Sequence, residues 1–310
     1  MDFPISGVTI NPFFLIGIGF VVGLLGGFFG VGGGFLAGPL MFWAGVPMNF
    51  VVGTDLAHMT GKSIVAAKRH RTLGHVDVRL GFVMILGTIV GVEIGARIIE
   101  VLQASGNIDH VIGITYVVIL LTISALTAGE SIHAIRLTKQ LKSAAGDDDP
   151  EQHRDVVSFG QVTRFVRRIR LWPMVSFPGS GIEEISLWIV ILVGLSTGIL
   201  AGALGVGGGF LRMPLLVYVL GVPTHVAVGT DLFEIMFSAG YGTLTHAVKG
   251  NVDILMALVM HTGAALGAQI GAMSTRYFAG PRIRLLFSLL PLIGALLVLV
   301  RLLGSSVPAF

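Results

Sequence analysis

The sequence predicts an all-α polytopic membrane protein built from two inverted repeats, each with about five transmembrane segments. Three observations lead to this prediction. Hydrophobic residues make up 54% of the 310 residues and charged residues only 12%, whereas a soluble domain carries about 25% charged residues. Several apolar runs approach or exceed the roughly 20 residues that cross a bilayer. The chain also repeats itself, because GVGGGFLAGPL from Gly30 returns as GVGGGFLRMPL from Gly205.

The repeat extends far beyond these glycines. The motif VGTDL at 52–56 returns at 228–232, and from Gly45 onward the offset between the two halves stays at 176. Self-similarity of this kind defines the units of a fold. We therefore predict a first transmembrane repeat, a cytoplasmic linker and a second transmembrane repeat, at residues 8–128, 129–183 and 184–305.

Hydropathy divides each half into five apolar segments, and the second segment of each half is short and holds Gly and Pro. The segments lie at about 10–29, 33–46, 50–67, 79–101 and 109–127, and at about 184–204, 209–221, 225–247, 253–273 and 284–303. The N-terminus has no Lys or Arg ahead of its first apolar run, so we expect a retained span and not a cleaved signal peptide.

Basic residues predict how the segments cross the membrane, because cytoplasmic loops are enriched in Lys and Arg. The connection at 68–79, the linker with its eight Lys and Arg, and the connection at 276–284 fall on one side only if each half crosses five times. Four crossings per half would place the three arginines of 276–284 outside. We therefore expect a multi-pass plasma-membrane protein with both termini outside and the linker in the cytoplasm.

The linker has two distinct parts. The acidic run DDDPE at 147–151 is typical of a solvated or disordered connection. The stretch FGQVTRFVRRIRLWP at 159–173 mixes four arginines with apolar and aromatic residues. This stretch is consistent with a helix on the anionic inner membrane face, or with a plain basic tether.

The doubled glycine cluster predicts a binding site. Short Gly- and Pro-interrupted segments at matching places in two repeats are a pointer to a transporter site. A half-helix that begins after such a cluster directs free amides and the positive end of its dipole toward an anion. The alternative is that the glycines only allow tight helix packing. The predicted substrate-binding glycines are Gly32, Gly33, Gly34, Gly207, Gly208 and Gly209.

Charged residues mark the third segment of each half. Asp55, His58 and Lys62 lie on one helical face, and the matching face of the second half holds Asp231, Glu234 and Ser238. A charge at mid-bilayer costs about 2.5–3.5 kcal/mol on the insertion scale and usually faces a cavity. We assign the two aspartates, His58 and Glu234 to coupling, and Lys62 to the substrate, unless Lys62 extends to the membrane interface.

Three further polar residues are candidate substrate ligands. Thr54 and Thr230 precede the two aspartates, and their hydroxyls are suited either to substrate contact or to helix capping. Arg212 follows the second glycine cluster where the first half has Ala37. Its guanidinium is suited to an oxyanion, but internal pairing with Asp231 or Glu234 is the alternative.

These residues resemble the sulfite exporter TauE/SafE family of membrane permeases. The resemblance depends on the two GVGGG clusters with Pro39 and Pro214 and on the two VGTD motifs, and it covers nearly the whole chain outside the linker. It implies a secondary transporter, an exporter, that carries a small sulfur-containing anion, such as sulfite or an organosulfonate, outward across the cytoplasmic membrane. Acidic residues near an anion site suggest H⁺ or Na⁺ as the coupling ion.

Other functions remain as alternatives. Asp55, His58, Asp231 and Glu234 together are suited to a divalent-cation carrier, and paired aspartates occur in intramembrane proteases. Both aspartates share a Gly-Thr-Asp context, which is not typical of such a protease. We expect no enzyme activity, no catalytic residues, no cofactor, no bound metal and no nucleic-acid partner; the expected partners are the small anion, the coupling ion and the lipid bilayer.

Overall fold

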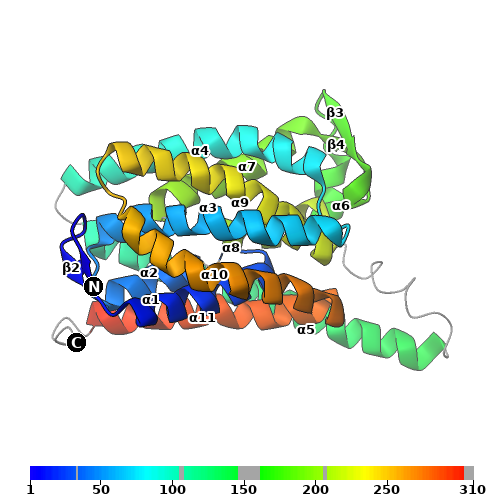
Figure 1. Ribbon diagram of the computed structural model, residues 1–310. Coiled ribbons are helices and arrows are strands. Elements are labelled where there is room, and N and C mark those ends of the chain that lie inside the picture. Colours follow the sequence, from blue (N-terminus) through cyan, green and yellow to red (C-terminus); the bar gives the residue numbers. More distant parts are fainter. Residues whose placement is uncertain (33, 105–107, 146–160, 205–207, 304–310) are drawn as a thin grey trace.

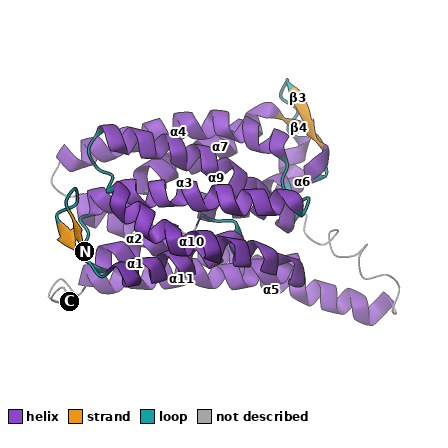
Figure 2. Ribbon diagram, in the orientation of Figure 1, coloured by secondary structure: helices purple, strands orange, loops and turns teal. Residues whose placement is uncertain are grey.

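The computed structural model describes residues 1–32, 34–104, 108–145, 161–204 and 208–303. Long helices lie side by side in a bundle, and two small strand pairs lie at opposite ends of it (Figure 2). The elements of the first half are β1 (Asp2–Phe3), β2 (Val8–Thr9), α1 (Pro12–Phe29), α2 (Gly34–Trp43), α3 (Met48–Thr72), α4 (Val78–Ala104) and α5 (Ile108–Ala145), and Figure 1 labels β2 and the helices.

The second half begins after the short helix α6 (Gln161–Arg168), with a hairpin of β3 (Met174–Phe177) and β4 (Ile182–Ser186) joined through the turn η2 (Pro178–Ser180). Its helices follow the order of the first half: α7 (Leu187–Leu204), α8 (Gly209–Pro214) with the π-helical turn η3 (Leu215–Leu220), α9 (Thr224–Val248), α10 (Ile254–Ser274), the turn η4 (Thr275–Tyr277) and α11 (Gly280–Leu303).

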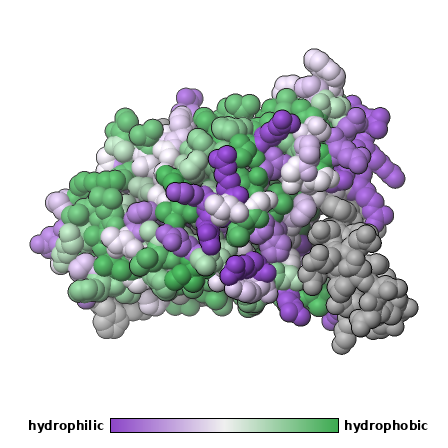
Figure 3. All heavy atoms as spheres, turned by 45° about the vertical axis from the view of Figure 1, so that its right-hand side comes forward, coloured by the Kyte–Doolittle hydropathy of each residue, from purple (hydrophilic) through white to green (hydrophobic). Residues whose placement is uncertain are grey.

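The prediction of a helical membrane protein is confirmed. Within the described residues, five helices are long and apolar enough to cross a membrane, at Pro12–Phe29, Val78–Ile98, Val117–Arg136, Ile254–Tyr277 and Gly280–Val300. Shorter apolar helices cover Leu187–Ala203 and Gly209–Leu220. The helices α3 and α9 are 25 residues long, a length that spans a bilayer, but they carry the charged residues. On the face that Figure 3 shows, large apolar areas alternate with hydrophilic side chains.

The first helix of each half packs on the fourth helix of the other half. Along α1, Gly19, Gly23 and Gly27 face the backbone of α10 at Met260, Ala264 and Ala268, so the two helices run parallel. A Cβ at any of these glycines would collide with the facing carbonyl group. Gly87, Gly91 and Gly95 of α4 face α7 in the same way. These stripes are the small-residue contacts that hold membrane helices together.

The third helices of the two halves, α3 and α9, pack against each other in opposite directions. Gly53 near the start of α3 faces Asn251 beyond the end of α9, and Gly229 near the start of α9 faces His75 beyond the end of α3. His75 and Asn251 therefore lie at opposite ends of α3. Which membrane face each end meets stays a prediction.

The basic connections lie together at one end of the bundle. Ser180 of the β3–β4 turn donates a hydrogen bond to Asp77, at 2.7 Å, in the connection after α3. Thr224 at the start of α9 accepts a hydrogen bond from Arg284 of α11, at 2.6 Å, and α9 begins beside His75. The end of the bundle that carries α6 and the hairpin therefore also carries the connections at 73–77 and 275–280.

The two halves share a further similarity ahead of the predicted repeats. The sequence FPISGV at 3–8 matches FPGSGI at 177–182, and both segments form hairpins with a left-handed glycine, φ 71° at Gly7 and 66° at Gly181. Hydropathy does not reveal these hairpins, because they precede the apolar helices α1 and α7 and are too short to give a signal of their own. Each hairpin presents a serine to the opposite half of the chain.

A helix crosses the predicted start of the linker at residue 129. Helix α5 continues to Ala145, because residues such as Leu, Ala, Lys and Gln after the apolar segment are strong helix formers. The acidic run at 147–151 lies outside the described residues. In the described part of the basic stretch, a helix covers Gln161–Arg168 and ends before Pro173 and the β3–β4 hairpin.

Candidate functional site

Both glycine clusters lie where helices break inside the bundle. Helix α1 ends at Gly30 with φ 81°, and α8 begins after Gly208 with φ 68°; both backbones are left-handed, which favours glycine. Gly32 has φ 63°, and Gly34 and Gly209 begin the short helices α2 and α8. Gly33 and Gly207 lie outside the described residues.

The two breaks meet near the centre of the protein. A Cβ at Gly209 would lie 2.9 Å from the backbone of Val31. A Cβ at Gly32 would lie 3.0 Å from Met59 Sδ and 3.2 Å from Ile235 Cδ1. Met59 and Ile235 are equivalent positions of α3 and α9, and with Leu56 and Ala239 they form a small buried apolar cluster. The glycine backbones are thus covered by an apolar layer that belongs to both halves.

The first charged cluster belongs to α3. Asp55, His58 and Lys62 are all about 1% exposed, and His58 Nδ1 lies 3.3 Å from Asp55 Oδ1. Among the described residues, Lys62 Nζ, His58 Nε2 and Asp55 Oδ2 have no hydrogen-bond partner. A buried ammonium without an acceptor is costly, so this arrangement favours a ligand at Lys62. The Lys62 side chain is enclosed by protein, and its depth in the membrane stays a prediction.

The second charged cluster joins α7, α8 and α9. Arg212 Nη1 donates to Asp231 Oδ1 at 2.8 Å and pairs with Glu234 Oε2, and Arg212 Nε donates to Thr197 Oγ1 at 3.2 Å. Ser238 adds a hydrogen bond to Glu234. All these side chains are buried. The structure therefore places Arg212 in the internal ion pair that the sequence left as the alternative to substrate contact.

The charges of the two clusters differ. With all acids ionised and His58 neutral, Asp55 and Lys62 sum to zero, whereas Arg212, Asp231 and Glu234 sum to −1. A net negative charge in a buried site is unfavourable. One proton on either carboxylate of the second cluster neutralises it.

Thr54 and Thr230 have the same structural role in opposite halves. Thr54 Oγ1 accepts a hydrogen bond from the backbone N–H of Asp253, and Thr230 Oγ1 accepts one from that of Asp77, both at 2.9 Å. These amides precede α10 and α4. Each threonine thus satisfies an amide at the start of a helix of the other half and does not cap its own helix, which begins six residues earlier.

His261, near the first charged cluster, was not predicted from the sequence. His261 of α10 lies against Gly61 of α3 and interacts electrostatically with Lys62. The first half has Ile85 at the equivalent position, so the mismatch between the halves was a usable signal. His261 adds a second imidazole beside the buried ammonium.

The geometry of the two charged clusters bears on the alternative functions. Asp55 pairs with His58 whereas Asp231 pairs with Arg212, so the two aspartates do not form the shared pair that an aspartyl protease needs. Within the ranges that the structure describes, no group of three or more His, Asp or Glu side chains is placed to hold a metal ion.

A bundle of apolar helices, interrupted at matching glycines and enclosing buried charged clusters, is typical of a multi-pass membrane protein. The sequence matches the family described as sulfite exporter TauE/SafE over residues 15–298. The chain belongs to this family.

Curated relatives agree with this assignment. A probable membrane transporter protein of Xylella fastidiosa is 40% identical over 119 residues, which cover 37% of this chain and 44% of the relative. The probable membrane transporter protein YdhB of Bacillus subtilis is 31% identical over 114 residues, 37% of this chain and 46% of the relative. Each match thus spans less than half of the relative. No solved structure matches. These relatives are described as probable membrane transporters.

Proposed function

We propose that this transporter carries a small sulfur-containing anion such as sulfite, coupled to protons. The observation that carries the proposal is the buried ammonium of Lys62, which has no hydrogen-bond acceptor among the described residues. A buried cation in this state is suited to an anionic ligand, since charge-assisted hydrogen bonds are the strong ones. The family name supports sulfite as the first substrate to test.

The anion site in this proposal combines Lys62 with the two helix breaks. Gly32 and Gly34 of the first half and Gly208 and Gly209 of the second lie at the two helix breaks, where the amides at the start of a helix are suited to an anion, and Gly33 and Gly207 belong to the same clusters. Thr54 and Thr230 are already bonded to backbone amides, so they support the site by holding α10 and α4 in place.

The coupling site in this proposal is the Arg212–Asp231–Glu234 cluster. When both carboxylates are ionised, they hold the guanidinium between them. When one carboxylate is protonated, Arg212 loses a counter-ion and becomes available to the anion. Proton binding and anion binding are then mutually favourable, which links the two fluxes. Asp55 and His58 form the corresponding pair in the first half.

Opposite membrane orientations of the two halves are part of the proposal. The antiparallel packing of α3 and α9 supports it, and so do the basic connections at one end of the bundle. Cysteine labelling of His75→Cys and Asn251→Cys tests it, with labelling from opposite faces expected. Labelling of both from one face would overturn the inverted arrangement.

The direct test is sulfite flux in proteoliposomes. We expect Lys62→Gln to lower the flux about tenfold or more, because a hydrogen bond to a charged group contributes ~1.5–3 kcal/mol. Lys68→Gln is the matched control, since Lys68 lies on the same helix but is exposed. Equal flux in both variants would refute the anion site.

The coupling ion is tested in the same vesicles. We expect sulfite flux to respond to an imposed pH gradient, and Glu234→Gln to remove that response while uncoupled flux continues. A flux that ignores the pH gradient but follows a sodium gradient at constant pH would replace the proton by Na⁺. A flux indifferent to both gradients would overturn coupling altogether.

A further inference from the structure

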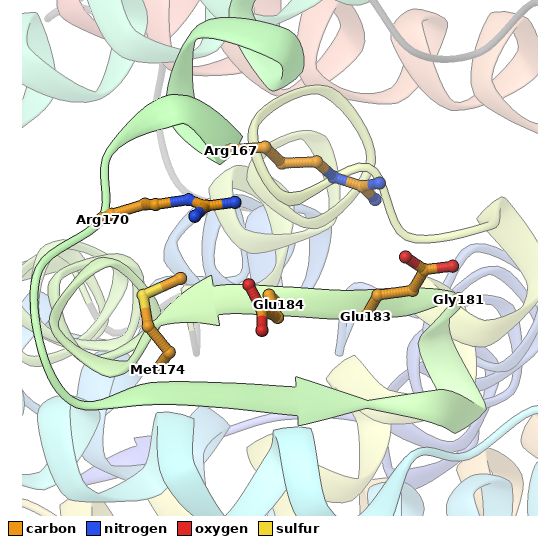
Figure 4. Close-up of a pocket in the computed structure, with 6 residues that line it drawn as sticks. All are labelled: Arg167, Arg170, Met174, Gly181, Glu183 and Glu184. Atoms are coloured by element: carbon orange, nitrogen blue, oxygen red, sulfur yellow. The ribbon is translucent and has the colours of Figure 1, made fainter.

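A polar hollow lies outside the transport site, between α6 and the β3–β4 hairpin. Its volume is about 370 Å³, within the range of small-molecule sites. Figure 4 shows Arg167 and Arg170 on one side of the hollow and Glu183 and Glu184 on the other, with Met174 near one edge. Arg167 comes from α6, Arg170 from the segment after it, and both glutamates from β4.

The distribution of charge in the hollow restricts its ligand. The arginines would attract a simple anion, but the two glutamates would repel it. A simple cation would be attracted by the glutamates and repelled by the arginines. A ligand that carries a negative and a positive group side by side satisfies both walls. Guanidinium groups bind phosphate through paired donors, and carboxylates accept hydrogen bonds from a primary ammonium.

The surroundings of the hollow indicate a lipid. Phe165, Leu171 and Trp172 border it in the sequence and are exposed, with Trp172 87% exposed. The indole N–H of Trp188, at the start of α7, donates to the Trp172 carbonyl at 3.1 Å, which places two tryptophans at the end of an apolar helix. Tryptophan is enriched at the membrane–water interface, and basic sites at helix ends bind lipid head groups.

We infer that this hollow binds the head group of a phosphatidylethanolamine-type lipid, with the phosphate at Arg167 and Arg170 and the ammonium at Glu183 and Glu184. The exposed aromatic and aliphatic side chains then lie where the acyl chains begin. This inference depends on the membrane placement of the bundle and not on the transported substrate, so its failure leaves the proposed function untouched.

Lipid binding to the purified, delipidated full chain tests the inference by native mass spectrometry. The three probes are phosphatidylethanolamine, phosphatidylcholine and phosphatidylglycerol with identical acyl chains. We expect the ethanolamine lipid to bind about tenfold more tightly than the choline lipid, a difference of ~1.4 kcal/mol, because a trimethylammonium cannot donate hydrogen bonds. Equal binding of these two lipids, or tighter binding of the glycerol lipid, would overturn the inference.

Variants separate the two walls of the hollow. Glu183→Gln with Glu184→Gln is expected to abolish the preference for ethanolamine over glycerol, and Arg170→Gln is expected to weaken all three lipids. Arg164→Gln is the matched control, because Arg164 is exposed on α6 but does not line the hollow. If the double glutamine variant still prefers the ethanolamine lipid to the glycerol lipid, the ammonium does not bind at Glu183 and Glu184, and the inference is wrong.

A variant-free measurement covers the case in which the hairpin variants do not fold. Soluble phosphoethanolamine is expected to displace a bound fluorescent ethanolamine lipid from the wild-type protein, whereas phosphocholine at the same concentration is not. Displacement by both compounds, or by neither, would contradict recognition of the primary ammonium.

Discussion

Removing the guanidinium of Arg212 is predicted to destabilise the folded protein strongly. In Arg212→Gln the charge of the second cluster changes from −1 to −2, and two buried carboxylates lose the group that holds both of them. Breaking a buried ion pair from one side costs about 3–5 kcal/mol. At ~2 °C per kcal/mol, the value for larger domains, Tm is expected to fall by roughly 6–10 °C.

The assay is thermal unfolding of the full chain in detergent at pH 7.5, with a second variant as the internal check. Adding Glu234→Gln to Arg212→Gln removes one unpaired carboxylate and is expected to restore at least half of the lost Tm. Arg97→Gln is the matched control, because Arg97 also pairs with a glutamate, Glu93, but their side chains are 73% and 39% exposed. Exposed pairs of this kind contribute about 0.3–0.5 kcal/mol, so Tm is expected to change by roughly 1 °C.

The refuting result is specific. If Arg212→Gln and Arg97→Gln lower Tm equally, or if the double variant is no more stable than Arg212→Gln alone, the carboxylates are not held by the guanidinium. The assignment of this cluster to coupling then loses its electrostatic basis.

Three further predictions concern a buried hydrogen bond, a close helix contact and the pH dependence of stability. Thr230→Val leaves the amide of Asp77 without its acceptor, so Tm is expected to fall by roughly 2–6 °C for a loss of ~1–3 kcal/mol; Thr230→Ser keeps the acceptor, and equal losses in both variants would contradict this. Gly23→Ala is expected to prevent the packing of α1 on α10, measured as folded yield in size-exclusion chromatography. Gly17→Ala on the same helix is the control, because its Cβ meets nothing within 4 Å, and it is expected to leave the yield unchanged. Equal yields of the two variants would refute the close contact. Burial lowers the pKa of His75, and the neighbouring His225 lowers it further. The unfolded chain therefore binds more protons below pH 6.5, so the stability of the fold decreases as the pH drops through that value. We expect His75→Asn to reduce the dependence of Tm on pH between 7.5 and 5.5. An unchanged pH dependence in His75→Asn would assign the effect to other groups.

The sequence predicts the helices and the buried charges because their signals are local. The offset of 176 residues makes α3 and α9 equivalent helices, and the spacing of Asp55, His58 and Lys62 places them on one helical face. Internal pairing of Arg212 with acids of α9 is also predictable as one of two alternatives, because a buried charge requires a partner.

The contacts between the halves could not be predicted from the sequence. Thr54 and Thr230 have the pattern of caps on their own helices, yet each bonds an amide of the opposite half, which depends on how distant segments pack. The apolar layer of Met59 and Ile235 carries no distinctive pattern, since such residues are common in any membrane helix. The hairpin at the start of each repeat is missed because short strands ahead of an apolar run give no hydropathy signal.

The first helix of each half packs on the fourth helix of the other half, and this arrangement has a consequence for how the protein moves. Each glycine stripe is matched by the backbone of the other repeat, so one repeat alone leaves its most closely fitted surface without a counterpart. A conformational change that keeps both glycine contacts intact must therefore carry α1 together with α10, and α4 together with α7. In the proposed transport cycle, the units that shift would then be composites of the two repeats and would not coincide with the two halves of the sequence.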